Sequence, residues 1–510
     1  MEIEFKFLVP PERLAEVEAA MRTGGFEAID LQARYFDTRD GALAKADVAL
    51  RMRKEGDHWV QTAKARGDGP LDRFEHNVDL GDPADPTALP DIGLHQDTHV
   101  GRALEKAIGG AELIETFSTA IRRVVRLETR SDTQVEFALD IGRVIAQGLD
   151  GAPARESAVC ELEIELVHGD VAVLTDLAKE WVAQYGLALS TLSKAGRGQR
   201  LLDGERPVAA VKATPPAFAL GDGEAPDGAE IQRRVVGACL AQILPNASEL
   251  AAGSEDADAV HQLRVGIRRL RTALRELDRL AEGNFDPAWQ GPLRHTFATL
   301  GRSRDGELLA TKMQPMLEAA GGPSIAVGSG MATDSTEATP GMTVTETVRL
   351  APFQIVLVEL IGFATRTAGT ASDANASGPK QARKHIGKRL DALHRAVVKG
   401  GRHFEALEPE EQHRVRKRLK RLRYLAEFVG ALFDAKGVAK YIDNLTPAQD
   451  MLGEFNDMSV ASVSYRRLAV RDPRAWFGVG WFYASQQQAA RDCRKSLATI
   501  EDARRFWKGD

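Results

Sequence analysis

Acidic and basic side chains alternate with apolar ones along several short segments in the N-terminal part of the chain. The chain opens with Glu2, Glu4 and Lys6 interleaved with apolar residues, and a strand places such alternate residues on one face. The same alternation returns around Arg51 and Arg53, Lys64, Arg73 and Glu75, Glu136 and Asp140, and Glu161, Glu163 and Glu165. One such strand alone would indicate the solvated face of an antiparallel sheet. The whole set is better explained by a shared, charged interior.

A cavity lined by both signs of charge suits one kind of chemistry. Carboxylates at this density repel one another, so hard divalent cations such as Mg²⁺ or Mn²⁺ are their natural counter-charge. Arginine and lysine in the same cavity would repel those cations unless a polyanion lay between them, and a triphosphate offers oxygens for both. Transfer of a phosphoryl group to water needs mainly positioning and charge neutralisation, which these residues supply.

The elements that would carry these residues fall into two architectures. The pattern predicts short alternating strands to about residue 202 and long amphipathic helices from about residue 228. We expect an antiparallel closed β-barrel (α+β), with its apolar exterior covered by helices such as Leu14–Met21 and Val171–Tyr185, followed by an all-α helical bundle. The predicted boundaries are 1–203 for the barrel domain, 204–228 for a linker rich in Pro and Gly, and 229–508 for the helical domain.

The helical part contains an internal duplication. The segment that begins at His261 and the segment that begins at His413 align histidine with histidine and base with base. An aspartate follows 44 residues after each histidine, as Asp305 and Asp457. The pattern predicts a duplicated helical hairpin with two related basic helices, in which the aspartates anchor basic side chains.

Each copy carries a basic stripe at helical spacing. His261, Arg264, Arg268 and Arg271 form the first stripe, and His413, Arg416, Lys420 and Arg423 form the second. A helix this basic repels itself unless anions or facing acids neutralise it. The stripes lack the interleaved aromatic residues of single-strand nucleic-acid platforms, so they favour polyphosphate over nucleic acid as the partner.

The composition and the N-terminal segment indicate the cellular compartment in which we expect the protein. The 510-residue chain has a net charge of −6, yet 15 Lys and Arg face 5 Asp and Glu between Lys380 and Arg423. Three separated cysteines indicate neither disulfides nor a zinc site. The charged N-terminal segment does not resemble a secretory signal, and the apolar stretch Phe353 to Ala364 is too short to span a bilayer. We expect a cytoplasmic protein with no membrane partner.

The motifs together resemble a known family. ExExK at Glu2, Glu4 and Lys6, then LRMRK, QTAKA, RFEHNV, ALDIG, CELEIEL and LSKAGRG, are similar in kind and order to a CYTH-domain triphosphate tunnel metalloenzyme. The duplicated basic helices resemble a CHAD domain, and the fusion is the architecture of bacterial inorganic triphosphatases. The resemblance covers nearly the whole chain.

The resemblance implies roles for individual residues. Phosphate binding is implied for Lys6, Arg51, Arg53, Lys64, Arg73, Arg123, Lys194 and Arg197. Metal binding is implied for Glu2, Glu4, Asp140, Glu161 and Glu163, and a catalytic role in orienting the attacking water falls to Glu2 or Glu4, with Lys6 beside them. Polyphosphate binding is implied for His261, Arg264, Arg268, Arg269, Arg271, His413, Arg416, Lys420, Arg421 and Arg423.

Two departures from the family pattern leave alternatives open. Val125 stands where the family often has a second base after Arg123, so that phosphate contact is lost or supplied by Arg126. The run Glu161, Glu163 and Glu165 leaves open which two would bind metal.

The leading hypothesis is metal-dependent hydrolysis of inorganic triphosphate to diphosphate and phosphate, with polyphosphate bound by the helical domain. Its rivals are a non-catalytic polyphosphate-binding or targeting protein, a CYTH-type adenylate cyclase and a thiamine triphosphatase.

Overall fold

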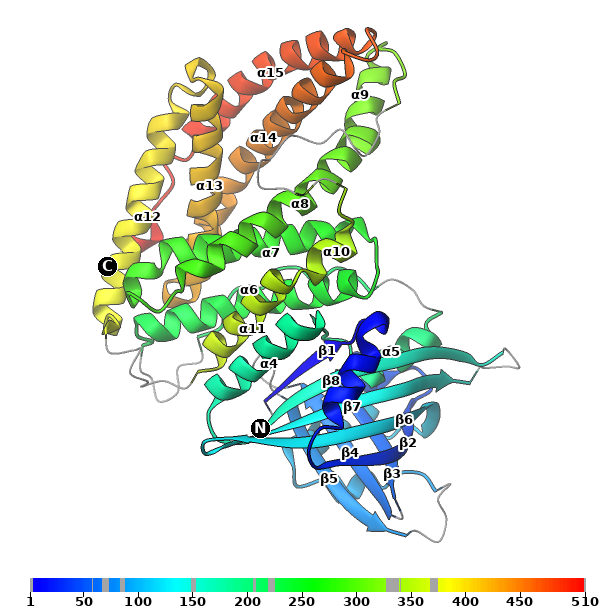
Figure 1. The fold of residues 1–510 in the computed structure, drawn as a ribbon. Coiled ribbons are helices and arrows are strands. Elements are labelled where there is room, and N and C mark those ends of the chain that lie inside the picture. The colour runs from blue at the N-terminus through cyan, green and yellow to red at the C-terminus, as the bar shows by residue number, and fades with distance from the viewer. Residues whose placement is uncertain are drawn as a thin grey trace. The chain divides into compact units, whose positions relative to one another are not determined.

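The computed structural model describes residues 3–56, 58–66, 73–82, 88–147, 153–204, 208–218, 225–326, 339, 341–366 and 375–508. The chain forms two compact units, one built on a sheet and one entirely helical (Figure 1). The first unit comprises Met1–Ala210, Leu244–Asp256 and Val348–Thr365, and the second comprises Val211–Ile243, Ala257–Thr347 and Arg366–Asp510. The predicted two-domain architecture is confirmed. Two stretches beyond residue 229 nevertheless belong to the first unit.

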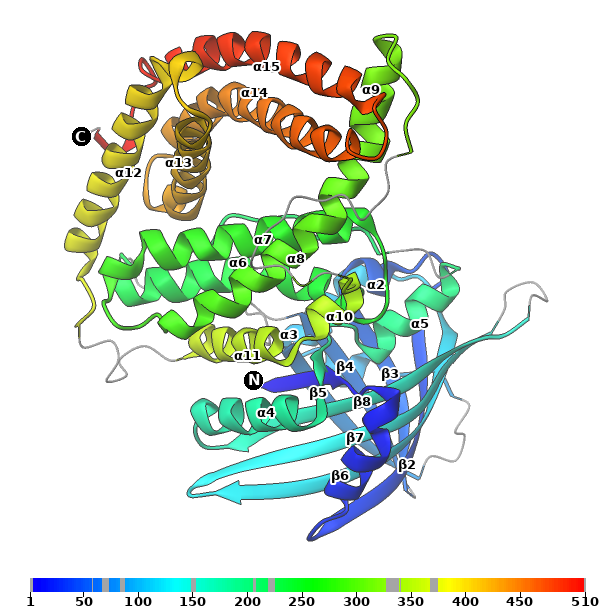
Figure 2. The same ribbon diagram turned by 45° about the horizontal axis from the view of Figure 1, so that its top comes forward.

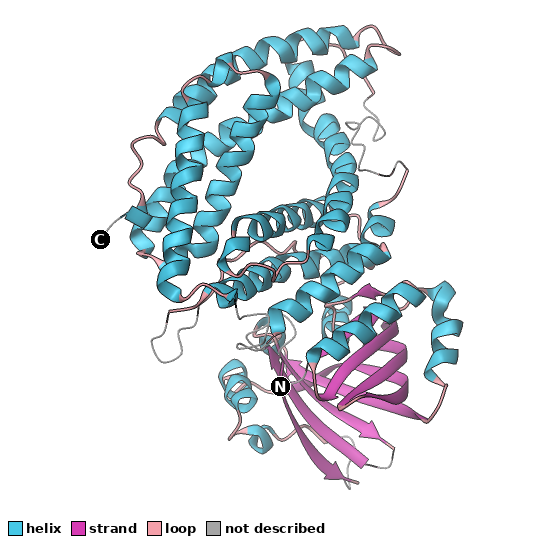
Figure 3. Cartoon of the chain, turned by 60° about the vertical axis from the view of Figure 1, so that its left-hand side comes forward, coloured by secondary structure: helices cyan, strands magenta, loops and turns pink. Residues whose placement is uncertain are grey.

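Among the described residues, nine strands form one antiparallel sheet in the order β5-β4-β3-β2-β6-β7-β8-β1-β9 (Figure 3). The strands are β1 (Glu4–Leu8), β2 (Phe26–Thr38), β3 (Val48–Glu55), β4 (His58–Arg66), β5 (Arg73–Gly81), β6 (Leu113–Arg130), β7 (Thr133–Ala146), β8 (Arg155–His168) and β9 (Ala188–Leu189). Most neighbours in the sheet are also neighbours in sequence, as expected for hairpins. The exceptions are the pairing of β2 with β6 and the pairings of β1. Strand β1 pairs with β8 and so brings the N-terminal motif beside the CELEIEL strand.

The sheet is open, so the predicted closed barrel is wrong. Its edges are β5 and β9, and no described residue of β5 pairs with β9 or β1. A barrel closes only when its first and last strands share a ladder. Strand β9 has two residues, which pair with Phe7 and Leu8 of β1, and the chain then leaves the sheet to form helix α5 (Lys194–Leu202). The alternating pattern fixed the two faces of each strand but carried no information about closure.

One face of the sheet is apolar and covered by helices, as the alternation predicts. Phe7 and Phe137 are fully buried on this face. Helices α1 (Leu14–Met21) and α4 (Val171–Tyr185) pack against it, and the ring of Trp181 lies 5.0 Å from the ring of Phe137. Burial of these large side chains is the main source of stability for the sheet.

Helix α5 lies on the opposite, polar face, beside β6, β7 and β8. Its Leu201 joins a buried apolar cluster that includes Phe117 of β6. A Cβ at Gly198 would lie 2.3 Å from the Phe117 ring, so only glycine allows the helix to approach the sheet this closely. This docking fixes Lys194 and Arg197, in the first turn of α5, over the polar face.

The first unit contains further helices, most of which pack against its strands or against α4. They are α2 (Ala42–Lys45), α3 (His99–Ile108), α11 (Ala351–Thr365) and the last part of α6 (Gly228–Ala251). Helix α11 packs against α4, and the amide oxygen of Gln354 accepts a hydrogen bond of 2.8 Å from the backbone N–H of Leu189 in β9. The apolar stretch Phe353 to Ala364 lies within α11. None of the helices in the described ranges combines the length and the apolar character that crossing a membrane requires.

The second unit is a helical bundle (Figure 2). Its helices are the first part of α6, then α7 (Ala257–Glu276), α8 (Gln290–Leu308), α9 (Gln314–Ala319), most of α10 (Val344–Arg349), α12 (Pro379–Gly401), α13 (Pro409–Val429), α14 (Ala435–Leu468) and α15 (Ala475–Ala498). The repeat copies fall on equivalent helix pairs, because α7 packs with α8 and α13 packs with α14. His261 and His413 lie in α7 and α13, and Asp305 and Asp457 lie in α8 and α14.

Candidate functional site

The strand register gathers acids and bases on the polar face of the sheet. Arg123 of β6 lies directly opposite Asp140 of β7, and Asp140 lies opposite Glu161 of β8. One row further along, Glu163 of β8 lies opposite Lys6 of β1. Directly opposed residues of antiparallel strands point to the same face. Residues that are far apart in the sequence therefore become neighbours on four adjacent strands.

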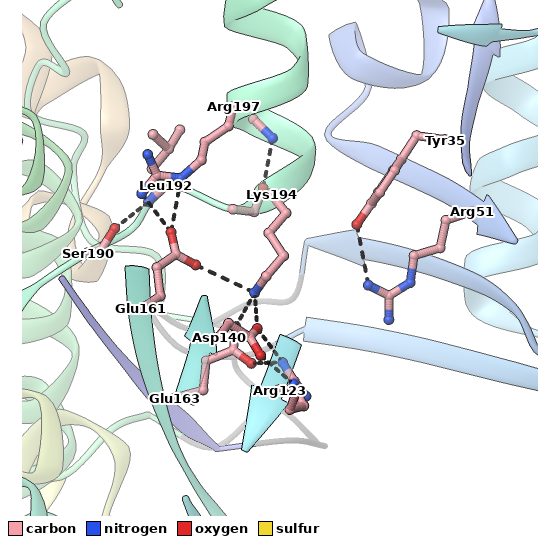
Figure 4. A network of polar contacts seen from close by, with 12 residues as sticks. Tyr35, Arg51, Arg123, Asp140, Glu161, Glu163, Ser190, Leu192, Lys194 and Arg197 are labelled. Atoms are coloured by element: carbon pink, nitrogen blue, oxygen red, sulfur yellow. Dashed lines mark hydrogen bonds and ion pairs between the residues drawn. The ribbon is translucent and has the colours of Figure 1, made fainter. Parts of the chain in front are cut away.

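Three carboxylates converge on the ammonium group of Lys194 (Figure 4). Its Nζ lies 2.6 Å from Asp140 Oδ2, 3.0 Å from Glu163 Oε1 and 3.5 Å from Glu161 Oε2. The side chains of Asp140 and Glu161 are fully buried, and those of Lys194 and Glu163 are nearly so. Buried charges persist only when they are paired and hydrogen-bonded, so this cluster is a self-neutralised set.

Two arginines complete the neutralisation. Arg123 donates from Nε and Nη2 to the two oxygens of Asp140, each at 2.7 Å, and from Nη2 to Glu163 Oε2 at 2.5 Å. Arg197 donates from Nε and Nη2 to Glu161 Oε1 at 3.0 and 2.6 Å. The fork between Arg123 and Asp140 is the bidentate geometry that guanidinium groups form with carboxylates and phosphates. Three positive and three negative side chains thus balance.

The neighbouring charges shift the pKa values in this cluster. Burial alone would raise the pKa of Glu163, but Lys194, Arg123 and Lys6 outweigh it and hold that pKa well below its usual value. Burial acts to lower the pKa of Lys194, yet Glu163, Asp140 and Glu161 raise it above its usual value. Burial lowers the pKa of Lys6 despite the opposing effect of Glu161 and Glu4.

A second group of bases lies on the same face, on strands β3 and β4. Arg51 donates from Nη1 to the Tyr35 hydroxyl at 3.3 Å, and its buried Nε has no hydrogen-bond partner among the described residues. Arg53 donates from Nε to Glu55 at 2.5 Å, and Lys64 forms an ion pair with Glu75. An unpaired buried N–H costs free energy, so Arg51 is a residue that an anion would satisfy.

The remaining predicted residues of the sheet unit lie as follows. Glu4 is on the polar face, opposite Glu165. Arg73 begins β5 opposite Arg66, but its side chain lies outside the described residues, and so does all of Glu2. Val125 faces the same side as Arg123, whereas Arg126 donates to the backbone oxygen of Ala20 in α1 and lies over the rings of the apolar face. Arg126 therefore does not replace the missing base.

The donor set suits a divalent cation, although it is engaged internally. Carboxylate oxygens are the ligands that Mg²⁺ and Mn²⁺ prefer, and the Lys194 ammonium marks the point where three of them meet. Across the part of the chain that the structure describes, no group of three or more His, Cys, Asp or Glu side chains is arranged to hold a metal ion. The Lys194 ammonium group lies at the point where a cation bound by all three carboxylates would lie.

In the helical unit, three arginines of α7 gather on one aromatic ring of α8. The guanidinium carbons of Arg264, Arg268 and Arg271 lie 4.5, 5.3 and 6.0 Å from the centre of the Phe297 ring. Arg264 also donates to the backbone oxygen of Phe297 at 2.9 Å. Cation–π contacts hold the three cations in a row, which is the predicted basic stripe.

Lys420 of α13 faces that row. Burial lowers the pKa of Lys420, and the nearby positive charges of Arg268, Arg416 and Arg264 lower it further, to about 6 against the opposing effect of Asp457. A lysine with so low a pKa is largely neutral at pH 7. The two basic stripes therefore lie close together, since charges on α7 act on Lys420 of α13.

Three of the predicted polyphosphate-binding residues are instead engaged with carboxylates. Arg269 is buried and forms an ion pair with Glu427, and Arg423 donates to Glu427 at 2.9 Å. Arg421 donates to Glu276 at 3.3 Å. His261 and His413 are exposed on their helices. Asp457 forms an ion pair of 3.3 Å with Lys312, and the side chain of Asp305 lies outside the described residues.

Sequence reasoning missed several residues of these clusters. Tyr35 is one of them, since its hydroxyl accepts a hydrogen bond from Arg51. Glu55 lies two residues after Arg53, so the strand alternation could have placed both on the same face. Phe297, Glu276 and Glu427 lie outside the repeated basic segments, and nothing in their local sequence indicated that they would meet the arginines.

Comparisons with known proteins identify two domain families in the chain. Residues 1–198 match the model of the CYTH domain family, and residues 234–466 match that of the CHAD domain family. An inorganic triphosphatase of Haemophilus influenzae is 28% identical over 206 residues, which cover 39% of this chain and only 54% of that relative. An uncharacterized protein of Mycobacterium tuberculosis is 26% identical over 529 aligned positions, covering 98% of this chain and 95% of that protein. The solved CHAD domain of the plant Ricinus communis is 24% identical, with a TM-score of 0.46 over 58% of this chain and 98% of that structure.

The sheet with its charged face is therefore a CYTH domain. The chain joins this domain to a CHAD domain and belongs to the proteins of CYTH–CHAD architecture.

Proposed function

We propose that the protein hydrolyses inorganic triphosphate to diphosphate and phosphate, with Mg²⁺ or Mn²⁺ as the cofactor. The observation that carries this proposal is the interleaving of buried acids and bases on one sheet face, centred on Lys194 and its three carboxylates. Such a face suits a ligand that combines a polyanion with a divalent cation, because each sign of charge then finds a partner.

The bases of the face would hold the triphosphate. These bases are Lys6, Arg51, Arg53, Lys64, Arg123, Lys194 and Arg197, with Arg73 as a further candidate. Their spread over β1, β3, β4, β6 and α5 suits a linear anion that is gripped at several points. Arg51 is already available to an anion, whereas the other contacts described above require a base to exchange a carboxylate for a phosphate oxygen.

The acids would hold the cation. Asp140, Glu161 and Glu163 are the ligands nearest to the Lys194 position, and Glu4 and Glu2 are the further candidates. A bound divalent ion supplies Lewis-acid polarisation of the phosphoryl oxygens. Glu161 and Glu163 both contact Lys194, whereas Glu165 lies opposite Glu4 and Glu136, so Glu161 and Glu163 are the better pair.

Hydrolysis requires a water molecule in line with the bond that breaks. In the proposed reaction a water oxygen bonds to a terminal phosphorus, the bond from that phosphorus to the bridging oxygen breaks, and diphosphate leaves. Glu4 or Glu2 would orient this water and take up its proton, and the surrounding bases would stabilise the charge on the leaving diphosphate.

The test is a substrate panel on the full chain, with tripolyphosphate, ATP and thiamine triphosphate, each with and without Mg²⁺ or Mn²⁺. We expect phosphate release from tripolyphosphate that requires the metal. Glu4→Gln and Arg53→Ala should each reduce kcat/KM, the latter by about 10- to 150-fold, which corresponds to the loss of one charged hydrogen bond of about 1.5–3 kcal/mol. The exposed Lys106 of α3 offers a neutral control, Lys106→Met.

Three outcomes would contradict the proposal. Undiminished activity in both site variants would show that the reaction occurs elsewhere. Cyclic AMP formation from ATP, or a preference for thiamine triphosphate, would show that the site catalyses a different reaction. No turnover of any compound would leave a binding protein without catalysis.

We also propose that the helical domain binds inorganic polyphosphate. The row of Arg264, Arg268 and Arg271 faces Lys420 of a second helix, where Arg416 lies near Lys420. Flexible linear polyanions bind to such rows by releasing their counterions, so affinity should fall steeply with salt. Retention of long-chain polyphosphate by the full chain, measured over a salt series, tests the proposal. Salt-independent or absent binding would refute it.

A further inference from the structure

In the helical unit, two ion pairs join the two copies of the internal repeat. Arg269 of α7 pairs with Glu427 of α13, and Arg421 of α13 pairs with Glu276 of α7. Arg269 and Arg421 occupy the same position in the two repeat copies, 152 residues apart. Each copy therefore supplies a carboxylate to the other copy's arginine. We call Arg269–Glu427 and Arg421–Glu276 the reciprocal pairs.

The reciprocal pairs are withdrawn from solvent. The side chain of Glu276 is fully buried, and those of Arg269 and Glu427 are 4% and 18% exposed. Glu276 also forms an ion pair with Arg389 of α12. Removing one partner of a buried pair leaves an uncompensated charge, so such pairs fix geometry even when they add little net stability.

The reciprocal pairs hold α7 and α13 in an arrangement that is electrostatically unfavourable for their basic stripes. Lys420 lies beside Arg264 and Arg268, and Lys417 lies beside Arg271, so the basic stripes of α7 and α13 repel one another. Two helices with such faces would separate or rotate unless attraction elsewhere on the same helices opposed the repulsion. The reciprocal pairs provide that attraction between these two helices.

We propose that Glu276 and Glu427 are positioning residues for polyphosphate, an inference that rests on the polyphosphate binding proposed above. Neither carboxylate would contact the polyanion, and each would repel it at a distance. Their effect is to hold the two basic stripes close enough to engage one chain of phosphates together. Removing a negative charge should therefore weaken the binding of a polyanion, which is the reverse of what net charge alone predicts.

The experiment compares Glu276→Gln and Glu427→Gln with Glu410→Gln in the full chain. Glu410 is exposed in the first turn of α13, so the control removes the same charge from the helix that carries Glu427 without breaking a reciprocal pair. Binding of long-chain polyphosphate is titrated by calorimetry at several salt concentrations. We expect Glu410→Gln to bind as the wild type or slightly more tightly, and each reciprocal-pair variant to bind at least tenfold more weakly. The salt slope of the reciprocal-pair variants should fall by about one or more, because fewer bases engage the polyanion at once.

The readouts separate the possible failures. If the wild type and Glu410→Gln do not bind polyphosphate, the proposed function itself fails and the inference falls with it. If these two bind but the reciprocal-pair variants bind equally or more tightly, only the positioning role is refuted. A lower number of binding sites with an unchanged Kd would mean that the variants merely unfold in part, and this also overturns the proposal. Glu427→Asp, which keeps the charge, should recover part of the affinity.

Discussion

Replacing Lys194 with methionine tests whether its ammonium occupies the place of the divalent cation. The substitution keeps an unbranched apolar side chain but removes a charge that contacts Asp140, Glu161 and Glu163. The cluster then changes from three acids balanced by three bases to three acids with two bases, Arg123 and Arg197. Without metal, the variant should be less stable than the wild type.

The size of the loss follows from burial. Breaking a buried ion pair by removing one partner costs about 3–5 kcal/mol, and the lower value applies because Arg123 and Arg197 still neutralise the same carboxylates. For a unit of about 200 residues, ~3 kcal/mol lowers the melting temperature by about 6–12 °C. A divalent cation at 100 times its Kd contributes ~2.7 kcal/mol to the folded state. Mg²⁺ or Mn²⁺ should therefore restore most of the loss in Lys194→Met.

The wild type should respond differently, because the cation must first displace Lys194. Metal alone should raise its melting temperature little, whereas metal together with tripolyphosphate should raise it strongly, since the phosphate then accepts the displaced ammonium. Scanning calorimetry gives the melting temperatures, and hydrogen exchange of peptides from β7 and β8 locates the effect. Lys106→Met serves as the control. Equal stabilisation of the wild type and Lys194→Met by metal alone would refute the reasoning.

Three further predictions follow from the charged clusters. The pKa of Glu163 is held well below 4.5 in the folded chain, so its stabilising effect is complete above that pH and is lost as the pH falls below it; Glu163→Gln should flatten the acid limb of melting temperature against pH. The pKa of Lys420 is about 6, so polyphosphate binding near neutral pH should take up a proton and strengthen as the pH falls toward 6. Calorimetry in two buffers of different ionisation enthalpy measures that proton, which Lys420→Arg should abolish. Arg268→Ala should reduce the salt slope of polyphosphate binding by about one with little loss of stability, whereas Arg421→Ala, which breaks a buried pair, should also lower the melting temperature.

The alternation of residue types predicted the faces of the strands correctly. A strand has a period of two, so Lys6 and the acids of the CELEIEL segment could be assigned to faces without knowing the fold. The order of the strands could not be assigned in this way. That Lys6 lies opposite Glu163 depends on the pairing of β1 with β8, which lie far apart in the chain. That Asp140 lies between Arg123 and Glu161 depends on the register of the consecutive strands β6, β7 and β8.

The same limit explains the error about closure. Alternation describes each strand separately, whereas a closed barrel depends on whether the terminal strands are long enough to pair. Strand β9 has only two residues, and no local pattern marked it as too short. Tertiary contacts add what the sequence could not show, since Lys194 contacts Glu161 and Glu163.

In the helical unit, helical spacing predicted the basic stripes but not the partners of their arginines. Arg269 and Arg421 were assigned with their neighbours to polyphosphate, because the sequence shows only that they are basic. Their carboxylates, Glu427 and Glu276, lie beyond the repeated motif and reach them through tertiary packing. Charge patterning identifies where a ligand could bind, but it does not show which charges the fold already neutralises.

The two domains neutralise their clustered charges in different ways, and this difference determines what each proposed ligand must supply when it binds. In the sheet, acids and bases neutralise one another directly, so an anion gains the bases only if the carboxylates that it releases find another cation. In the helical unit the carboxylates Glu276 and Glu427 lie beside the basic stripes, and Lys420 lowers the repulsion by remaining largely neutral. An anion can reach that cluster without displacing an acid, but its binding is coupled to the uptake of a proton by Lys420 from solvent. The requirement for a divalent ion therefore belongs to the proposed triphosphatase site, and the linkage to protons belongs to the proposed polyphosphate site.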